Sequence, residues 1–248
     1  MRVVVIIPSR YGSSRFDGKP LAPICGRPMV QWVYQRALEA ACVESVHVAT
    51  DDSRIRQAVE GFGGHVLMTA AECRSGTDRV AEAADRLGLD ATDVVINIQG
   101  DQPLVDPRSF DAVVQPFMQD PSVHMSTLAF AIQEAREIFD PKDVKVTFDR
   151  NGDALYFSRA TIPHARDGET DHDVYKHLGV YAYTREFLER FRSLPPGRLE
   201  EIEKLEQLRA MEHGYRIRVV VTPFDSPEVD LPADIVRIEN KMTAMGLC

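Results

Sequence analysis

The first half of the sequence predicts an α/β fold in which a mostly parallel sheet carries helices on both faces. Short apolar runs typical of buried strands alternate with amphipathic patterns typical of helices. This β-α-β-α order favours a parallel sheet. The expected strands are Val3–Ile7, Ser45–Ala49 and Asp93–Ile98, and the expected helices are Met29–Ala41, Ser53–Phe62 and Ser75–Leu87.

Each of these elements has a local signature. The strand Val3–Ile7 is an unbroken apolar run, and Asp93–Ile98 is another that leads directly into Gln-Gly-Asp. The helix Met29–Ala41 places apolar side chains at helical spacing on one face, and Ser75 or Thr77 is suited to cap the helix that follows it.

The second half of the sequence predicts a smaller antiparallel lobe on the same sheet, which we expect to contribute substrate contacts and a subunit interface. A polar loop around residues 164–173 interrupts the strands of this lobe. The expected strands are Val144–Phe148, Ala154–Ser158, Leu178–Tyr183 and Arg216–Val221; a charged helix is expected over Arg198–His213 and a last helix from about Pro232.

The chain is acidic, since 29 Lys and Arg residues against 38 Asp and Glu residues give a net charge of −9. This balance argues against duplex DNA or an anionic membrane as the main partner. The four cysteines (Cys25, Cys42, Cys73 and Cys248) have no C-x-x-C spacing and no disulfide-framework density, which is typical of a reducing compartment. No stretch has the length of a signal or membrane-spanning segment, so we expect a cytoplasmic protein.

A cationic loop after the first strand is the most informative stretch of this acidic chain. Arg10, Arg15 and Lys19 stand there among small residues, and Gly12 and Gly18 allow backbone N–H groups to approach an anion. The spacing excludes a Walker A loop, and no G-x-G-x-x-G follows the strand. The loop therefore predicts a phosphate-binding site of another kind, in preference to a solvated basic loop.

Polar clusters follow the expected strands at the edge where a parallel sheet binds ligands, at Arg10, at Thr50-Asp51-Asp52 and at Gln99-Gly100-Asp101. Asp101 beside a cationic loop suits a magnesium ion that bridges protein and phosphates, although a turn aspartate that caps its own backbone fits equally well. Asp230 is the candidate second carboxylate, and its alternative role is to cap the last helix.

Further polar residues stand in motifs whose default interpretation is structural. Ser75-Gly76-Thr77-Asp78-Arg79 fits a helix cap, His177 fits a hydrogen-bonded structural histidine, and Glu206-Gln207 fits the solvated face of a helix. Arg159 and His177 are nevertheless suited to hold a carboxylate.

Taken together and in order, the motifs resemble the 3-deoxy-manno-octulosonate cytidylyltransferase family, also called CMP-Kdo synthetases, from residue 3 to about residue 239. The motifs are Ile-Pro-Ser-Arg-Tyr followed by Gly-Lys-Pro-Leu, then Thr-Asp-Asp, Ser-Gly-Thr-Asp-Arg, Gln-Gly-Asp-Gln-Pro-Leu, Leu-Tyr-Phe-Ser-Arg, Lys-His-Leu-Gly-Val-Tyr and Leu-Glu-Gln-Leu-Arg. The resemblance implies a Rossmann-like nucleotidyltransferase fold, a homodimer, and magnesium-dependent transfer of a cytidylyl group from CTP to the sugar acid for lipopolysaccharide assembly, with release of pyrophosphate. It implies one domain over residues 1–248, with a mainly nucleotide-binding part (1–120), a mainly sugar-acid and dimer lobe (121–225) and a C-terminal helix (226–248).

The resemblance also implies roles for individual residues. The nucleotide site is implied at Arg10, Ser13, Ser14, Lys19, Ser75, Asp78, Arg79, Gln99 and Asp101, of which Arg10, Lys19 and Asp101 are catalytic. Magnesium is implied at Asp101 and Asp230, and the sugar-acid site at Arg159, His177, Tyr181, Glu206 and Gln207. The implied reaction is an in-line attack of the anomeric 2-hydroxyl on the α-phosphorus.

The chain departs from the usual family pattern in three places, at Phe16-Asp17, at Gln102 and between Glu228 and Asp234. Gln102 and the run that ends at Glu228 resemble a branch that uses 8-amino-3,8-dideoxy-manno-octulosonate, and an added carboxylate is able to attract an ammonium group. The alternatives are a cytidylyltransferase for sialic acid or methylerythritol phosphate, a catalytically silent nucleotide-binding regulator, and a glycosyltransferase that uses a preformed sugar nucleotide.

Overall fold

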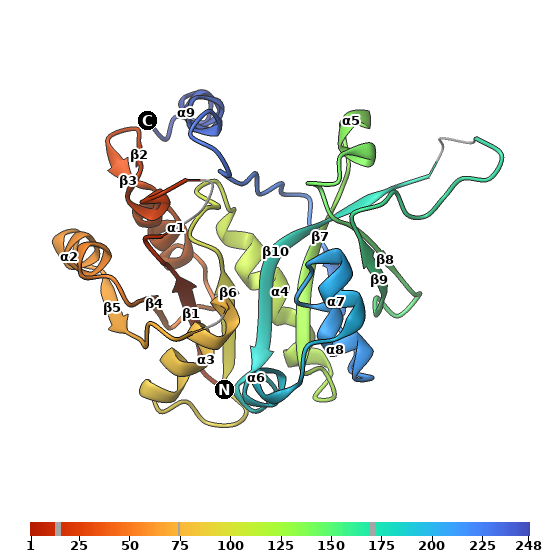
Figure 1. Cartoon of the computed structure of the whole chain (residues 1–248), viewed down its shortest axis with the longest axis horizontal. Helices are drawn as coiled ribbons and strands as arrows, with labels where there is room; N and C mark the ends of the chain where they lie inside the picture. The colour runs from red at the N-terminus through yellow and green to blue at the C-terminus, as the bar shows by residue number, and fades with distance from the viewer. Residues whose placement is uncertain (13–15, 74, 169–171) are drawn as a thin grey trace.

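The computed structural model describes residues 1–12, 16–73, 75–168 and 172–248 and has a twisted, mostly parallel central sheet (Figure 1). Its strand order is β11-β7-β10-β6-β1-β4-β5, and β8 and β9 extend it beside β10. The strands are β1 (Val3–Pro8), β4 (Ser45–Thr50), β5 (His65–Met68), β6 (Val94–Ile98), β7 (Met125–Ala131), β8 (Lys145–Phe148), β9 (Ala154–Ser158), β10 (Tyr175–Thr184) and β11 (Arg218–Val221). The predicted fold class is confirmed.

Helices cover both faces of the sheet because the central strands bury side chains in both directions. On β1, Val3, Val5 and Ile7 join the core beneath α1, α2 and α4, whereas Val4 and Ile6 join the core on the opposite face beneath α3 and α6. The helices are α1 (Met29–Leu38), α2 (Ser53–Gly61), α3 (Gly76–Arg86), α4 (Pro107–Gln119), α5 (Ala135–Phe139), α6 (Arg185–Ser193), α7 (Arg198–Glu203), α8 (Leu208–Glu212) and α9 (Asp234–Ala244).

The carboxyl ends of the parallel strands meet at one edge of the sheet. β1 pairs in parallel with both β4 and β6, so the polar segments that follow these three strands lie together, as predicted. In Figure 1 this edge is at the top, below α5 and α9, and the N-terminus lies at the opposite edge.

The strand predicted at Leu178–Tyr183 is longer than expected and joins the two halves of the molecule. As β10, it runs antiparallel between β6 and β7 in the central sheet, and its first residues pair with β8 of the β8–β9 hairpin. The pairing of β10 with β7 shifts register between Leu178 and Tyr181. The nucleotide-binding part and the lobe expected from the sequence therefore share a strand.

The single charged helix predicted over Arg198–His213 is wrong. The chain turns at Lys204, which adopts a left-handed conformation (φ 55°), and separates α7 from α8. Leu205 and Leu208 are buried at this break, and Arg209 pairs with Glu200 across it. Tertiary packing therefore overrides the helical pattern and leaves residues 206 and 207 in the turn.

The segment between β11 and α9 crosses the carboxyl edge of the sheet. The N–H of Val229 donates to the carbonyl of Asp101 (3.0 Å), which fixes this segment above the end of β6. The last helix begins at Asp234, close to the predicted Pro232, and Ile238 and Met242 pack it on Ile24 and Trp32.

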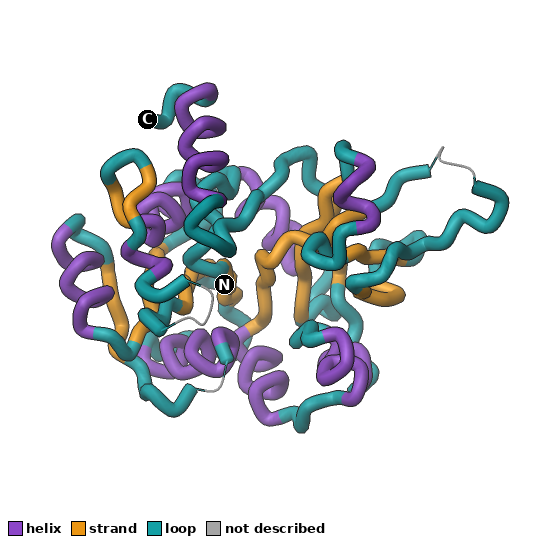
Figure 2. Tube along the Cα trace, turned by 45° about the horizontal axis from the view of Figure 1, so that its top comes forward, coloured by secondary structure: helices purple, strands orange, loops and turns teal. Residues whose placement is uncertain are grey.

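Two of the cysteines form a disulfide, which corrects the expectation drawn from their spacing. Cys25 and Cys248 are bonded, with a Cα–Cα distance of 5.6 Å. Local spacing carried no sign of this bond because 223 residues separate the two positions. Cys25 lies at the turn of the small sheet formed by β2 (Pro23–Ile24) and β3 (Arg27–Pro28), which Figure 2 shows beside α9. Across the described ranges, no helix has the length and apolar character needed to span a bilayer.

Candidate active site

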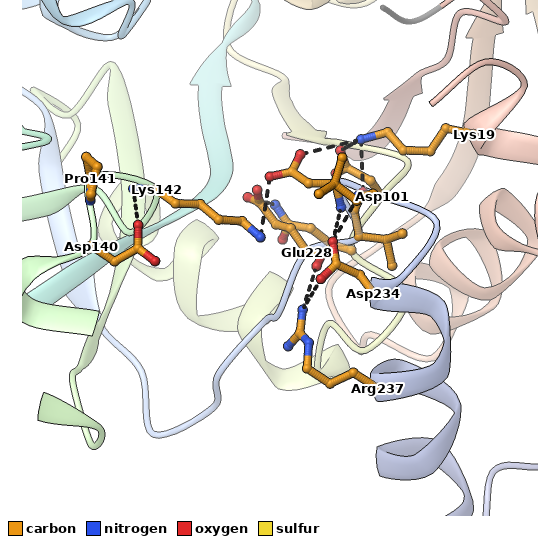
Figure 3. Close-up of polar contacts among 12 residues, drawn as sticks. Lys19, Asp101, Asp140, Pro141, Lys142, Glu228, Asp234 and Arg237 are labelled. Carbon is orange, nitrogen blue, oxygen red and sulfur yellow. Dashed lines mark hydrogen bonds and ion pairs between the residues drawn. The ribbon is translucent and has the colours of Figure 1, made fainter. Parts of the chain in front are cut away.

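Lys19 gathers two acidic side chains at the carboxyl edge of the sheet. It opens the short 3-10 helix η1 (Lys19–Leu21), directly after Gly18, which has a left-handed backbone (φ 68°). Lys19 Nζ lies 2.5 Å from Asp101 Oδ2 and 3.9 Å from Asp230 Oδ1, and it donates to the carbonyl of Val229 (3.0 Å). The structure thus brings together three predicted site residues from three distant parts of the chain. Figure 3 labels two of them, Lys19 and Asp101.

The chemistry of this acidic pair suits a magnesium ion. Asp101 Oδ1 is buried and has no hydrogen-bond partner among the described residues. Within those residues no group of three or more His, Cys, Asp or Glu side chains is placed to hold a metal. Mg²⁺ commonly binds through one or two carboxylates plus substrate phosphates, so a pair is sufficient when a phosphate supplies further oxygens.

Glu228 brings a third carboxyl group to this cluster. Burial, with the nearby charges of Asp101 and Asp230, raises the pKa of Glu228 to about 8. Gln102 Nε2 donates to Glu228 Oε1 (3.4 Å), and Ser226 Oγ donates to Gln102 Oε1 (2.8 Å). The two departures from the family pattern at 102 and 228 are therefore direct neighbours.

Lys142 belongs to the same cluster and was missed by the sequence analysis. Its Nζ lies 3.6 Å from Asp230 Oδ2, and Figure 3 shows Lys142 and Lys19 pointing toward the cluster from opposite sides. Lys142 comes from the turn after α5, in the second half of the chain, where its backbone N–H donates to Asp140. A lone lysine in such a turn has no local signal that would distinguish it from a solvated side chain.

Glu228→Gln is expected to remove part of the pH dependence of stability. The pKa of an unfolded glutamate is about 4.3, and it is raised to about 8 in the folded chain. The folded state therefore binds more protons between these values, so the free energy of unfolding falls as pH rises from about 4.3 to about 8. Urea titrations across this range in metal-free buffer measure the slope. The exposed Glu44→Gln is the matched control, and equal slopes for wild type and Glu228→Gln would contradict the prediction.

Two of the predicted nucleotide-binding residues, Arg10 and Arg79, line a cavity of about 440 Å³. Its lining includes Arg10, Asp51, Arg54 and Arg79. Arg79 is buried, donates to Thr69 Oγ1 (2.5 Å) and pairs with Asp51 Oδ1 (3.1 Å), whereas Arg10 is exposed. The cavity therefore has one guanidinium group held in place by its partners, that of Arg79, and one that is accessible to a ligand, that of Arg10.

The predicted nucleotide residues Ser75, Asp78 and Gln99 lie around the start of α3. Ser75 caps the helix by accepting a hydrogen bond from the N–H of Asp78 (3.1 Å), so the predicted helix cap is confirmed. The amide of Gln99 lies close enough that a Cβ on Gly76 would be 3.4 Å from it. The predicted Ser13 and Ser14 lie outside the described residues.

Two predicted sugar-acid residues, His177 and Tyr181, lie on β10, and Arg159 directly follows β9. Arg159 donates through Nε to the carbonyl of Glu203 (2.7 Å) and through Nη1 to that of Pro141 (3.0 Å). The rings of His177 and Tyr181 lie 5.2 Å apart. Burial lowers the pKa of His177 to about 3, so its imidazole is neutral at physiological pH.

The helix break described above turns Glu206 and Gln207 inward, rather than placing them on a solvated helix face. Thr77 Oγ1 donates to Glu206 Oε2 (2.6 Å), which links the start of α3 to the sugar-acid set. Glu206 Oε1 and Gln207 Nε2 are buried without a hydrogen-bond partner among the described residues. Such atoms are costly unless a ligand or water serves them.

Tyr181, a predicted sugar-acid residue, lies near both Glu206 and the Glu228 carboxyl of the acidic cluster. Burial, with smaller effects from the charges of Glu206 and Glu228, raises the pKa of Tyr181 well above its ordinary value. A Cβ on Gly179 would lie 3.0 Å from Gln102 Nε2 and 3.5 Å from Glu228 Oε1, so a larger residue there would push against the acidic cluster. Residues predicted for the sugar acid therefore lie next to the acidic cluster at Gln102 and Glu228.

A family model described as cytidylyltransferase matches residues 4–217. A 3-deoxy-manno-octulosonate cytidylyltransferase of Desulfatibacillum aliphaticivorans is 64% identical over 239 residues, which cover 96% of this chain and 98% of that protein. An 8-amino-3,8-dideoxy-manno-octulosonate cytidylyltransferase of Shewanella amazonensis is 57% identical, with coverage of 98% and 99%.

Two solved structures share the fold. A CMP:2-keto-3-deoxy-manno-octonic acid synthetase complexed with CTP is 43% identical, with a TM-score of 0.92, over 99% of this chain and all of that one. A cytidylyltransferase from Leptospira borgpetersenii is 17% identical with a TM-score of 0.65 over 98% of this chain and 87% of that one, which is a likeness of fold alone.

Proposed function

This chain belongs to the cytidylyltransferase family, and we propose that it transfers the cytidylyl group of CTP to a 3-deoxy-manno-octulosonate sugar acid, for lipopolysaccharide assembly. The observation that carries the proposal is the convergence of Lys19, Asp101 and Asp230 beside the polar residues of β10. The residues assigned to the cation and triphosphate and those assigned to the sugar acid then lie side by side.

The residues on the nucleotide side act mainly by charge. We assign Arg10 and Lys19 to the triphosphate, where they offset the repulsion between two anionic substrates and stabilise the departing pyrophosphate. Lys19 is already held by Asp101, so it is ordered before a ligand arrives. Magnesium held by Asp101 and Asp230 would supply further charge neutralisation and increase the acidity of the attacking hydroxyl.

The residues on the lobe side act mainly by position. We assign Arg159, His177, Tyr181, Glu206 and Gln207 to the sugar acid. They hold its anomeric 2-hydroxyl in line with the α-phosphorus of CTP. The new bond joins this oxygen to the α-phosphorus, the bond from that phosphorus to pyrophosphate breaks, and the hydroxyl proton is released. Orientation of this kind contributes about 7–11 kcal/mol in favourable cases.

Apolar side chains on the lobe support the further proposal that the enzyme is a homodimer. Phe139, Leu155 and Ile202 are 75%, 61% and 67% exposed, respectively, so their apolar surface is available to a second copy of the chain. Sedimentation equilibrium measures the mass in solution.

We also propose that the enzyme acts in the cytoplasm, where its substrate CTP is available.

Pyrophosphate release tests the proposed function. The enzyme is incubated with CTP and magnesium and with one acid at a time: 3-deoxy-manno-octulosonate, its 8-amino analogue or sialic acid. Release that requires one of the two octulosonates is expected. Release only with sialic acid would support the alternative cytidylyltransferase, and CTP binding without any release would support a silent regulator.

The 8-amino analogue is favoured as the second candidate substrate by Glu228. This carboxyl group faces Gly179 between the sugar-acid residues of β10, and no lysine or arginine of the described chain lies within ion-pair distance of it. An ammonium group on the sugar acid would supply the missing partner.

Glu228→Gln is therefore expected to lower kcat/KM for the 8-amino analogue by about tenfold or more and to change that for the parent acid much less. The ratio of the two kcat/KM values isolates this effect from any general loss of activity. An unchanged ratio would assign Glu228 to the acidic cluster alone and remove the argument for the amino sugar.

A further inference from the structure

A buried threonine on β7 contacts both His177 and the backbone beside it. Thr127 is fully buried, and its Oγ1 lies 2.9 Å from His177 Nε2 and 2.8 Å from the carbonyl oxygen of Val180. This is the place where the pairing of β10 with β7 shifts register. The Thr127 hydroxyl therefore forms hydrogen bonds with the Val180 carbonyl, at an irregular point of the sheet, and with the His177 imidazole.

These two contacts determine which nitrogen of His177 carries the proton. A hydroxyl has one proton, and a carbonyl oxygen only accepts, so the Thr127 proton goes to Val180. Oγ1 must then accept from His177, which requires a proton on Nε2. In the opposite tautomer, Nε2 would be an acceptor and the Thr127 proton would turn toward it. The carbonyl of the fully buried Val180 would then lose its hydrogen bond from Thr127, which is unfavourable.

The other ring nitrogen of His177 is consequently a lone-pair acceptor. Nδ1 makes no hydrogen bond within the described residues. It is also not one of their fully buried polar atoms that lack a partner, so a ligand is able to reach it. The edge contact with Phe157 (5.1 Å between ring centroids) and the contact with Tyr181 fix the ring plane. A neutral acceptor attracts a hydroxyl and repels a carboxylate.

We propose that Thr127 is a positioning residue that holds His177 as a neutral acceptor, so that Nδ1 accepts a hydrogen bond from a hydroxyl of the sugar acid and does not bind its carboxylate. The proposal rests on the proposed function for the identity of the ligand. The sugar carboxylate is then left to the unpartnered donor Gln207 Nε2 and to Arg159.

Thr127→Val removes the hydroxyl and keeps the shape of the side chain. We expect it to raise KM for the sugar acid by about tenfold with little change in KM for CTP. Thr127→Ser restores the hydroxyl and should restore KM. Ser126→Ala is the matched control, because Ser126 is equally buried on the same strand and its hydroxyl donates to Val113 instead.

Nitrogen-15 NMR of the histidines reports which ring nitrogen of His177 carries the proton. If Thr127 had only a structural role, Thr127→Val would not change this tautomer. The His177 signals are identified by their loss in His177→Gln, and wild type is expected to carry its proton on Nε2, whereas Thr127→Val loses this preference. A proton on Nδ1 in wild type, or a KM for the sugar acid that Thr127→Val leaves unchanged, overturns the proposal. If wild type uses no sugar acid at all, the proposed function fails, while the tautomer measurement still tests the assignment of the proton.

Discussion

Replacing Asp101 by asparagine is expected to lower kcat/KM by about 10²- to 10³-fold. The substitution keeps the size of the side chain and removes one charge at the point where Lys19 and Asp230 meet. Lys19 would lose its closest partner, and the buried Oδ1, which has no partner in the described chain, would lose its affinity for a cation. Steady-state kinetics across a magnesium titration measures the effect, and the concentration of magnesium needed for half-maximal rate should rise.

A nearby aspartate provides the control for Asp101→Asn. Asp106 caps α4 through the N–H of Arg108 and lies five positions further along the chain. Asparagine caps a helix about as well as aspartate, so Asp106→Asn should leave both stability and kinetics close to wild type. Near-normal turnover and magnesium dependence in Asp101→Asn would show that the metal is held elsewhere.

Lys19→Met is expected to reduce kcat/KM by a similar factor, about 10²- to 10³-fold. Methionine keeps an unbranched side chain of nearly the same length but offers no charge to the triphosphate or to the departing pyrophosphate. The change also leaves Asp101 without its 2.5 Å ion pair, so the acidic side chains of the cluster should repel one another more strongly. Single-turnover rates, compared with CTP binding measured separately, divide the loss between binding and chemistry.

The exposed Lys241 on α9 is the matched control for this charge change. Lys241→Met alters the net charge of the protein by the same amount and should leave single-turnover rates unchanged. Rates for Lys19→Met within about twofold of wild type would reject a role for Lys19 in neutralising the triphosphate.

The parts of the fold that are dominated by local pattern were predictable from the sequence. The apolar run in β1 and the capped start of α3 lie where predicted, because continuous burial and a serine cap leave strong local signals. The meeting of Lys19 with Asp101 also follows from local signals, since both residues come soon after neighbouring parallel strands.

Features that depend on long-range packing were not predictable in the same way. The break at Lys204 reflects burial of Leu205 and Leu208, and the composition of this segment resembles an ordinary charged helix. Strands β5 and β7 and helices α4 and α6 were also missed. Two residues of the site, Lys142 and Thr127, were not predicted for the same reason. Their positions are set by tertiary contacts with Asp230 and His177, respectively.

Transfer of a radioactive label from the α-phosphate of CTP tests the central claim most directly. With wild-type enzyme, magnesium and an octulosonate acid, the label should appear in a sugar nucleotide, and one unlabelled pyrophosphate should be released for each label transferred. Label found only in free CMP, or pyrophosphate release that does not depend on the sugar acid, would contradict the account.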